Sequence, residues 1–415
     1  MQVDDPGGVQ FILVSFAVNH KYKIGDYIFF GLFPSARNVL EHGVSVETSS
    51  KPRKNKYILL KVNRKVLSGI VYLRQLNYKK HMKKITPSLM AASLVAAFTF
   101  TASLPAQAGD KITIMVGGLD KQIYLPAKLA EQLGYLKETG LDIEILSEPS
   151  GVNAETEMLS GSAQGVVGFY DHTIDLQARG KSVTSVVQFS QAPGEVILVG
   201  KGKKIATPAD FKGKTIGVTG LGSSTNFLTQ YIAQVANVKS SEFTTIPVGG
   251  GSTFIAAMTQ GKIDAGMTTE PTVTKLVTEG SASILVDLRT VKSTEVALGG
   301  TYPAACLYMS TDWINRHKVE VQKIVNAFVK TLKYINTHSA EEITAKMPID
   351  YYTANKALYI KALDGGKQMF TADGVMPLNG PETVLKVLNS FDKAVIGQKI
   401  NLANTYTSEY VKKAQ

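Results

Sequence analysis

The sequence predicts an α/β protein of two lobes, each a mainly parallel sheet flanked by helices. Two observations lead to this fold class. Residues 147–180 share a pattern with residues 247–280, 100 positions later, with glycines and a methionine at matching places. Strand-like and helix-like patterns also alternate along both copies, and such alternation requires parallel strands covered by helices on both faces. Two copies of one unit therefore predict two lobes with a cleft between them.

The first recognisable element in chain order is a stretch typical of a secretory signal peptide. Two lysines at 83–84 precede an uncharged apolar run over 89–100, and Ala-Gln-Ala at 106–108 fits the small-residue cleavage pattern. A membrane span is the alternative interpretation, but the run is shorter than the ~20 apolar residues that a bilayer requires. The pattern predicts export of the chain that follows.

The charge distribution supports a start inside the chain. The formal net charge is +11, and nearly all of the basic excess lies in residues 1–81 and the two lysines just after Met82. A nearly neutral remainder gives no support to nucleic-acid binding. We predict that residues 1–81 are a disordered upstream extension, that 82–108 is a cleaved signal, and that the product is periplasmic.

Continuous apolar runs mark the strands of the predicted sheets. Runs at 112–116, 165–169, 183–189 and 283–288 carry almost no charge, as expected of strands buried on both faces. Ligands of such sheets bind beyond the carboxyl ends of the strands. Those ends are the loops GGLDKQ, EPSGV, FYDH, GLGSST, VGGGS and TTEP.

The loop GLGSST, residues 220–225, is the strongest single candidate for a ligand contact. Its glycines allow close approach of the backbone, and Ser223, Ser224 and Thr225 add hydroxyl groups at a predicted helix N-terminus. Unpaired N–H groups and a partial positive charge make such a terminus suitable for anionic ligand groups. A helix cap without any ligand is the alternative role for these hydroxyls.

No catalytic constellation is visible in the sequence. There is no G-x-S-x-G nucleophile elbow and no G-x-x-x-x-G-K-[ST] phosphate loop. His172, His317 and His338 have no metal-ligand spacing, and the single cysteine, Cys306, cannot form a zinc site or an internal disulfide. Asp171 beside His172 is typical of a helix cap and its neighbour. We predict no catalytic residue, no metal and no cofactor.

Three stretches carry a resemblance to a known family. They are PADFKGKTIGV (208–218) followed by GSST, LPAKLAEQLGYLKETGLDIEIL (125–146) and MTQGKIDAGMTTEP (258–271). Together they resemble the periplasmic substrate-binding proteins of nitrate, sulfonate and taurine ABC importers, including the thiamine-precursor-binding relatives. The resemblance implies a type II periplasmic-binding-protein fold that closes on its ligand, performs no chemistry and delivers the solute to a permease and its ATPase.

The resemblance also implies lobe boundaries and a ligand shell. Lobe one would comprise 109–198 and 304–415, and lobe two 199–303, in a monomer. The ligand shell would be drawn from the loops named above: Asp120, Lys121, Gln122, Tyr124, Phe169, Tyr170, Asp171, Ser223, Ser224, Thr225, Gly251, Ser252, Thr269 and Glu270.

The composition of that shell limits the ligand. Arginine is absent from the cleft loops, so any anionic group would depend on Lys121, hydroxyls and backbone N–H groups. Asp120, Asp171 and Glu270 set three acids against that one lysine, which disfavours a simple dianion. Small sulfonate-, nitrate- or taurine-like solutes remain open, as do aromatic or zwitterionic ones, and the shell aromatics favour a flat molecule.

An enzyme of the same fold is the main alternative, because yeast-type pyrimidine-forming proteins of thiamine biosynthesis resemble this family. Such an enzyme is expected to carry a cysteine-rich motif and active-site histidines. Cys306 alone does not supply the first, and an export signal argues against a biosynthetic role. A sensor lobe that reports ligand to a membrane kinase is a third possibility. We expect a transport receptor that is not an enzyme.

Overall fold

The chain divides into two units, residues 1–102 and 103–415. The computed structural model describes residues 111–352 and 355–414, together with four short strands nearer the N-terminus. Those strands form two antiparallel pairs within a segment that was expected to be disordered: β1 (Ile12–Ser15) with β2 (Ile28–Gly31), and β3 (Val44–Thr48) with β4 (Ile58–Val62). The signal peptide predicted over 82–108 lies outside the described residues.

The first sheet of the larger unit has the strand order β6-β5-β7-β14-β8. Its strands are β5 (Ile112–Val116), β6 (Ile143–Ser147), β7 (Gly165–Phe169), β8 (Val183–Gln188) and β14 (Ala305–Ser310). β5 pairs in parallel with β6 and β7, whereas β14 is antiparallel to both of its neighbours. Four strands therefore share one direction, and the strand that returns from the second lobe opposes them.

The second sheet repeats this arrangement in the order β11-β10-β12-β9-β13. Its strands are β9 (Glu195–Gly200), β10 (Thr215–Val218), β11 (Thr244–Pro247), β12 (Ala265–Thr269) and β13 (Ala282–Leu288). β10 pairs in parallel with β11 and β12, and β9 is antiparallel to β12 and β13. The predicted fold class, two mainly parallel sheets flanked by helices, is confirmed.

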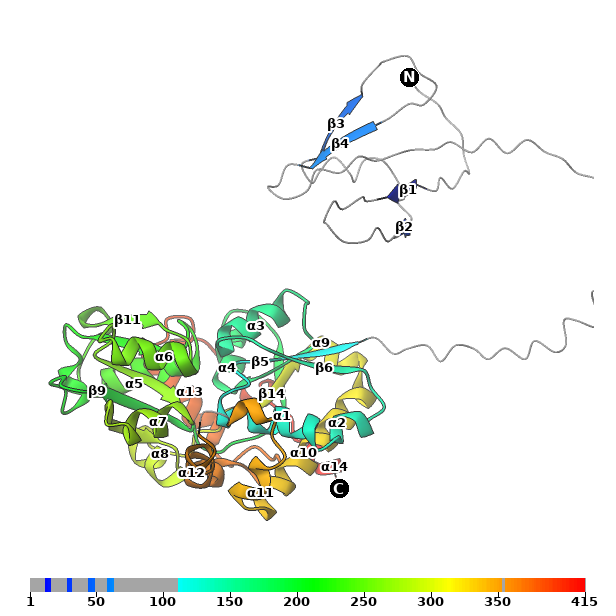
Figure 1. The fold of residues 1–415 in the computed structure, drawn as a ribbon. Coiled ribbons are helices and arrows are strands. Elements are labelled where there is room, and N and C mark those ends of the chain that lie inside the picture. Colours follow the sequence, from blue (N-terminus) through cyan, green and yellow to red (C-terminus); the bar gives the residue numbers. More distant parts are fainter. Residues whose placement is uncertain are drawn as a thin grey trace, which may run out of the picture. The chain divides into compact units, whose positions relative to one another are not determined.

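The sequence repeat is a structural repeat. The helix α3 begins at Gly151 and the strand β7 ends at Phe169, and their counterparts α6 and β12 begin at Gly251 and end at Thr269. In Figure 1 the two sheets form separate lobes, one with the cyan β5 and β6 and the yellow β14, the other green around β9 and β11. Gly151, Phe169 and Thr269, at such helix starts and strand ends, line one cavity.

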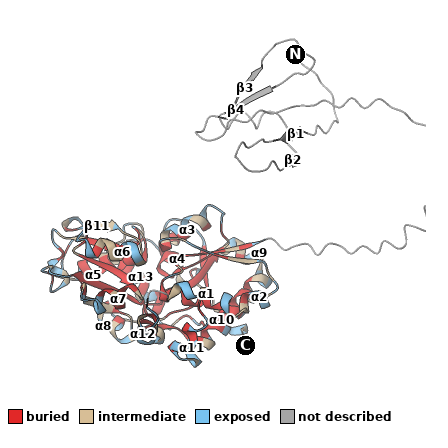
Figure 2. Ribbon diagram, in the orientation of Figure 1, coloured by how far each residue is buried: buried red, intermediate tan, exposed pale blue. Residues whose placement is uncertain are grey.

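Helices cover both sheets, and Figure 2 shows buried strands beneath helices with exposed outer faces. Their bounds are α1 (Leu125–Gln132), α2 (Tyr135–Glu138), α3 (Gly151–Leu159), α4 (Asp171–Ala178), α5 (Ser224–Val235), α6 (Gly251–Thr259), α7 (Thr272–Thr278), α8 (Val291–Leu298), α9 (Thr311–Arg316), α10 (Lys318–Thr337), α11 (Ala340–Thr344), α12 (Lys356–Gly366), α13 (Gly380–Phe391) and α14 (Glu409–Lys413). None of the described helices combines the length and hydrophobicity that a membrane crossing requires.

The helix α10 shows how apolar spacing sets burial. Apolar residues at helical spacing bury one face of this helix, at Val321, Ile324, Phe328 and Leu332. Val319, in the first turn of the helix, is 67% exposed.

Two passages connect the lobes. The strand β9 pairs wholly within the second sheet, so the first passage lies before Glu195 and not at the expected boundary between 198 and 199. The return segment after residue 304 also packs on both lobes, because α12 contacts α7 and α13 contacts α5. Phe391 at the end of α13 lies with its ring 6.1 Å from that of Phe227 in α5.

Candidate functional site

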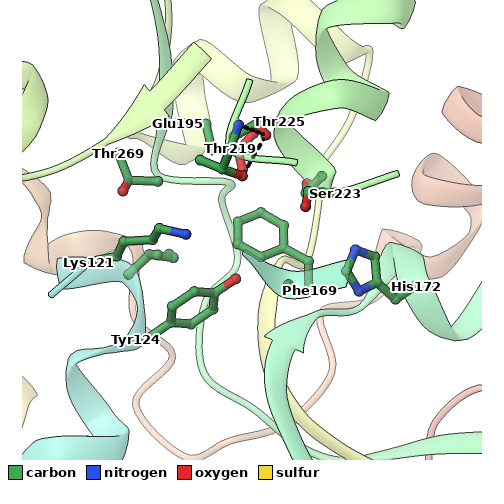
Figure 3. Close-up of a pocket in the computed structure, with 12 residues that line it drawn as sticks. Lys121, Tyr124, Phe169, His172, Glu195, Thr219, Ser223, Thr225 and Thr269 are labelled. Atoms are coloured by element: carbon green, nitrogen blue, oxygen red, sulfur yellow. Dashed lines mark hydrogen bonds between the residues drawn. The ribbon is translucent and has the colours of Figure 1, made fainter. Parts of the chain in front are cut away.

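A small cavity lies where the two lobes meet (Figure 3). Its volume is about 10 Å³, which is room for about one water molecule. A solute of several atoms can enter only if the lobes separate, so the structure represents a closed conformation. The lining residues come from both lobes: Lys121, Ile123, Tyr124, Gly151, Phe169, His172, Glu195, Thr219, Ser223, Ser224, Thr225 and Thr269.

Two aromatic rings form one wall of the cavity. Tyr124 follows the loop after β5, and Phe169 is the last residue of β7. Their ring centroids are 6.0 Å apart in an edge-to-face arrangement, and both side chains are buried. In Figure 3 Phe169 lies between Tyr124 and His172. A flat ligand would find ring faces and edges here to pack against.

Lys121 supplies the positive charge of the site, but its ammonium group already makes hydrogen bonds to the backbone. Its ammonium donates to the carbonyl oxygens of Gly117 and, at 3.1 Å, of Pro149. Burial lowers the pKa of Lys121 to about 8, although Asp120 and Glu195 oppose the shift. Since an ammonium has three donors, one N–H remains for a ligand. The expected dependence of anion binding on this lysine is therefore reduced.

Glu195 is a site residue that the sequence analysis missed. It is the first residue of β9, its side chain is buried, and its Oε2 makes no hydrogen bond within the described residues. Burial raises the pKa of Glu195 well above its usual range, the nearby Asp171 raises it further, and Lys121 opposes both. The sequence did contain a signal for this residue. Glu195 begins the apolar run GEVILVG, and an acidic side chain at the start of a buried strand is shielded from water.

His172 also lines the cavity, contrary to its interpretation as the neighbour of a helix cap. Its Nδ1 lies 3.1 Å from the Tyr308 hydroxyl, and its Nε2 has no hydrogen-bond partner within the described residues. Asp171 does not cap α4, because that helix has no side-chain cap bond. The Asp171 carboxylate instead accepts from the Tyr302 hydroxyl at 3.0 Å. Burial raises the pKa of Asp171.

The second lobe contributes hydroxyl groups. Ser223 occupies the N-cap position of α5, yet its hydroxyl makes no capping bond. Within the described residues Ser223 Oγ has no hydrogen-bond partner, and Ser224 Oγ has none of good geometry, although both residues are buried. The Ser224 hydroxyl still lies close enough to the Asp171 carboxyl to oppose the rise of its pKa. Leaving a buried hydroxyl unpaired costs about 1–3 kcal/mol. Of the two roles considered for this loop, capping is therefore not the one that its serine hydroxyls perform.

The threonines of the second lobe hold the loop in shape. The Thr225 hydroxyl accepts from the backbone N–H of Thr219 at 3.0 Å and bonds the Thr219 hydroxyl at 2.9 Å, as Figure 3 shows. Thr269, the end of β12, lines the cavity at the position equivalent to Phe169 in the other lobe.

Half of the predicted shell lies away from the cavity. Glu270 accepts from the Thr274 backbone N–H at 2.9 Å and from the Arg289 guanidinium at 2.7 Å. An arginine therefore does reach a cleft loop, but it neutralises an acid of its own lobe. The Tyr170 hydroxyl bonds that of Thr405, with its ring fully buried in lobe one.

The remaining predicted residues meet other parts of the protein. The side-chain amide of Gln122 donates to the Tyr359 carbonyl at 2.9 Å. Asp120 faces Gly251 across the cleft, since a Cβ on that glycine would lie 2.6 Å from Asp120 Oδ2. Ser252 is exposed. The side chains of Asp120, Gln122 and Ser252 therefore do not line the cavity, although their neighbour Lys121 does.

Residues 124–342 match the protein-family model described as NMT1/THI5 like. This match spans more than half of the chain. The chain belongs to the NMT1/THI5-like family. The family resemblance expected from the sequence is thus confirmed.

Relatives of known name include synthases. The chain is 28% identical over 235 residues to the 4-amino-5-hydroxymethyl-2-methylpyrimidine phosphate synthase THI13 of Saccharomyces cerevisiae, covering 54% of this chain and 67% of that protein. The synthase of the same name from Aspergillus parasiticus is 28% identical over 263 residues, covering 60% and 75%.

Solved structures of the same fold include binding proteins. A protein of Bordetella bronchiseptica RB50 is 36% identical, with a TM-score of 0.71 over 73% of this chain and 96% of that one. The alkanesulfonate-binding protein SsuA of Xanthomonas axonopodis pv. citri, bound to MOPS, is 18% identical with a TM-score of 0.56 over 72% and 96%. The nitrate-binding protein NrtA of Synechocystis PCC 6803 is 13% identical with a TM-score of 0.57 over 74% and 88%.

These comparisons establish the type II periplasmic-binding-protein fold. That fold is shared by proteins named for binding and by relatives named for synthesis. Within residues 111–352 and 355–414, no group of histidine, cysteine and acidic side chains is arranged to hold a metal ion.

Proposed function

We propose that this protein is the solute-binding receptor of an ABC importer and that it encloses a small, flat, nitrogen-bearing solute between its lobes. One observation carries the proposal: four of the residues that line the cavity beside two aromatic rings each have a buried polar atom that makes no hydrogen bond within the described part of the chain. These atoms are His172 Nε2, Glu195 Oε2, Ser223 Oγ and Ser224 Oγ. Burying each of these atoms costs free energy until a ligand supplies the missing hydrogen bond.

The mixture of these atoms favours a particular ligand chemistry. Burial raises the pKa of Glu195 and so favours its neutral form, which offers one O–H donor beside its acceptor oxygens, and the two serine hydroxyls can donate or accept. Nitrate and a simple sulfonate present acceptors alone, so they would leave the acceptor oxygens of the site without a hydrogen bond. A ring with an amino group and ring nitrogens presents donors and acceptors in one plane. The names of the relatives, which specify a pyrimidine product, support the same class.

The energy is sufficient for a transport receptor. Micromolar binding corresponds to about 8 kcal/mol. Three or four hydrogen bonds of about 0.5–1.5 kcal/mol each, more where a charge takes part, together with burial of a flat ring, supply that range after ordering costs. No metal or arginine fork is required.

The periplasmic location and the permease with its ATPase belong to this proposal. They rest on the signal predicted over 82–108 and on the fold. Sequencing the N-terminus of protein recovered from the periplasm should return Gly109 as the first residue. A first residue anywhere within 1–81 would contradict the export interpretation.

A pyrimidine-forming enzyme is the second candidate, favoured by the synthase relatives and by the histidine in the cavity. Against it, Cys306 is buried in β14, and His172 is the only histidine of the described residues that lines the cavity.

A thermal-shift screen followed by calorimetry tests the proposal. The panel comprises 4-aminopyrimidines, taurine, alkanesulfonates and nitrate. A true ligand at 100 times its Kd should stabilise the fold by about 2.7 kcal/mol, and the expected hits are aminopyrimidines. Stabilisation by nitrate or alkanesulfonates alone would overturn the ligand class. Mass spectrometry of the bound compound distinguishes the candidates, because a receptor returns it unchanged.

A further inference from the structure

We propose that Glu155, which does not line the cavity, determines the hydrogen-bonding role of His172 toward the ligand. By holding the imidazole proton on Nδ1, Glu155 leaves the Nε2 lone pair facing the cavity as an acceptor. The inference deepens the proposed function and rests on it. It makes Glu155 a positioning residue, since it acts through His172 and does not touch the ligand.

The geometry brings three elements together behind the imidazole. His172 is on α4, Glu155 on α3 and Tyr308 on β14. The Nδ1 atom lies 3.3 Å from Glu155 Oε2 and 3.1 Å from the Tyr308 hydroxyl. The His172 side chain is 1% exposed and that of Glu155 12%. Water therefore screens this charge only weakly.

Packing prevents the ring from exchanging its two nitrogens. A Cβ at position 151 would lie 2.8 Å from His172 Cε1, so the glycine at this position leaves the space that the imidazole ring occupies. From the second lobe, Phe227 packs edge-on against the ring, with centroids 6.0 Å apart and planes at 85°. Tyr308 borders a further side at 6.1 Å. Nδ1 therefore stays toward Glu155, and Nε2 stays on the other side of the ring, 3.9 Å from Asp171 Oδ1.

Electrostatics then select the tautomer. In a neutral imidazole one nitrogen donates and the other accepts. A carboxylate oxygen 3.3 Å from a bare Nδ1 lone pair would repel it, whereas a proton on Nδ1 turns the same contact into attraction. The Tyr308 oxygen can accept from that proton as well. Asp171 Oδ1 faces the other nitrogen at 3.9 Å, farther than Glu155 lies from Nδ1. Burial raises the pKa of both carboxyl groups and His172 opposes the rise in both, so the shorter distance gives Glu155 the larger influence on the tautomer.

The consequence concerns ligand choice. With the proton on Nδ1, the cavity presents two acceptors, His172 Nε2 and Glu195 Oε2. A ligand edge with two N–H donors satisfies both, whereas an anion would place its oxygens against a lone pair. Glu155 thus biases the site toward N–H donors from a position behind the imidazole.

The test is ¹⁵N NMR of histidine-labelled full-length protein, with the His172 signals assigned by their loss in His172→Gln. The wild type should show the Nδ1–H tautomer at pH 7. Glu155→Gln removes the charge but keeps the shape, and the Nε2–H tautomer should become populated. Tyr308→Phe, which retains the charge, should leave Nδ1–H dominant. Glu157→Gln on the same helix is the matched control and should change nothing.

Binding provides the second measurement, with 4-aminopyrimidine as the probe. Apparent affinity falls by the fraction of molecules that keep the competent tautomer, so Glu155→Gln should weaken binding by about twofold to tenfold and Glu157→Gln should not. The inference is overturned if the wild type shows an Nε2–H tautomer or an imidazolium. It is also overturned if Glu155→Gln leaves the tautomer unchanged. The NMR result needs no ligand, so it decides the role of Glu155 even if no aminopyrimidine binds and the proposed function fails.

Discussion

The two lobes share one strand order but line the cavity with different chemistry. Lobe one contributes aromatic rings, a lysine and an imidazole, through Tyr124, Phe169, Lys121 and His172. Lobe two contributes hydroxyl groups and one buried acid, Glu195. The pairing of Phe169 with Thr269 at equivalent strand ends shows the contrast at a single position.

This contrast separates two tasks. The duplicated topology brings strand ends and helix N-termini of both lobes to one cleft, whatever side chains they carry. One lobe can then hold a flat ring and its N–H groups while the other closes over it with donors that rotate to suit. The predictions that follow test whether the hydroxyl lobe is needed for binding and whether the charged lobe sets the pH response.

The largest effect is expected from removing the two serine hydroxyls of lobe two. The double variant Ser223→Ala, Ser224→Ala should weaken ligand binding by one to four powers of ten, with the upper end reached if both hydroxyls bond a charged group. The ligand-free fold should keep most of its stability, because within the described residues neither hydroxyl makes a hydrogen bond of good geometry and only Ser224 lies near a polar group, the Asp171 carboxyl. Calorimetry measures the first quantity and denaturant unfolding the second.

A true cap hydroxyl supplies the matched control. Thr290 caps α8 by accepting from the Ser293 backbone N–H at 3.1 Å. Thr290→Ala should cost about 1 kcal/mol of stability and leave binding unchanged. If the double serine variant behaved like Thr290→Ala, its hydroxyls would be capping groups and the contrast between the lobes would fail.

The buried lysine of lobe one should give the next largest effect, on stability against pH. Burial lowers the pKa of Lys121 from 10.5 to about 8. Between those values the unfolded chain binds the proton and the folded chain does not, so stability rises with pH across that window. Below pH ~8 the destabilisation is present in full, on the order of 3 kcal/mol at 1.36 kcal/mol per unit.

The variant Lys121→Met lacks this titration. Between about pH 8 and pH 10.5, the unfolding free energy of the wild type should therefore increase relative to that of the variant. Comparing the two proteins cancels the tyrosines that also titrate at high pH. Parallel curves would mean that Lys121 is not desolvated in the folded protein.

Closure of the two lobes is tested at Gly220, where the absence of a side chain lets lobe two contact lobe one. A Cβ on Gly220 of lobe two would lie 2.6 Å from Ser150 Oγ and 3.0 Å from Ser150 Cβ of lobe one, and also 2.9 Å from Ser223 Oγ of its own loop. Gly220→Ala should hold the lobes apart and weaken binding about tenfold to a hundredfold, given the 1–3 kcal/mol that overpacking typically costs. Small-angle scattering with ligand should show a larger radius of gyration than for the wild type.

A second substitution distinguishes closure from misfolding. Adding Ser150→Gly removes the opposing atoms and should restore most of the affinity, since glycine is tolerated at an N-cap. Gly365→Ala, at a helical site with no atom within 4 Å of the new methyl group, should leave binding intact. Failure of the double variant to recover would place the effect of Gly220 in the loop and not between the lobes.

The smallest effect is expected at Tyr170. Its hydroxyl bonds Thr405 inside lobe one, so Tyr170→Phe should cost about 1 kcal/mol of stability and leave affinity unchanged. Weakened binding with unchanged stability would return Tyr170 to the ligand shell where the sequence analysis had placed it.

The sequence by itself determined the fold class and the repeat, and it indicated several of the loops that line the cavity. Apolar runs bounded by glycines define the strands, and local periodicity needs no knowledge of distant neighbours. Because parallel strands end at one edge, the loops around Lys121, Phe169 and Ser223 were recognisable as cavity walls before any packing was known.

Only the tertiary structure decided which way individual side chains point. Glu270 was available to a ligand by position, but Arg289, nineteen residues later in sequence, neutralises it. His172 looked like the neighbour of a cap, and its place in the cavity depends on Gly151, Tyr308 and Phe227, which come from three other elements. Such contacts join residues far apart in the chain, so no local pattern encodes them. The sequence alone therefore indicated several loops of the site, and long-range packing decided which polar atoms there remained free to bind.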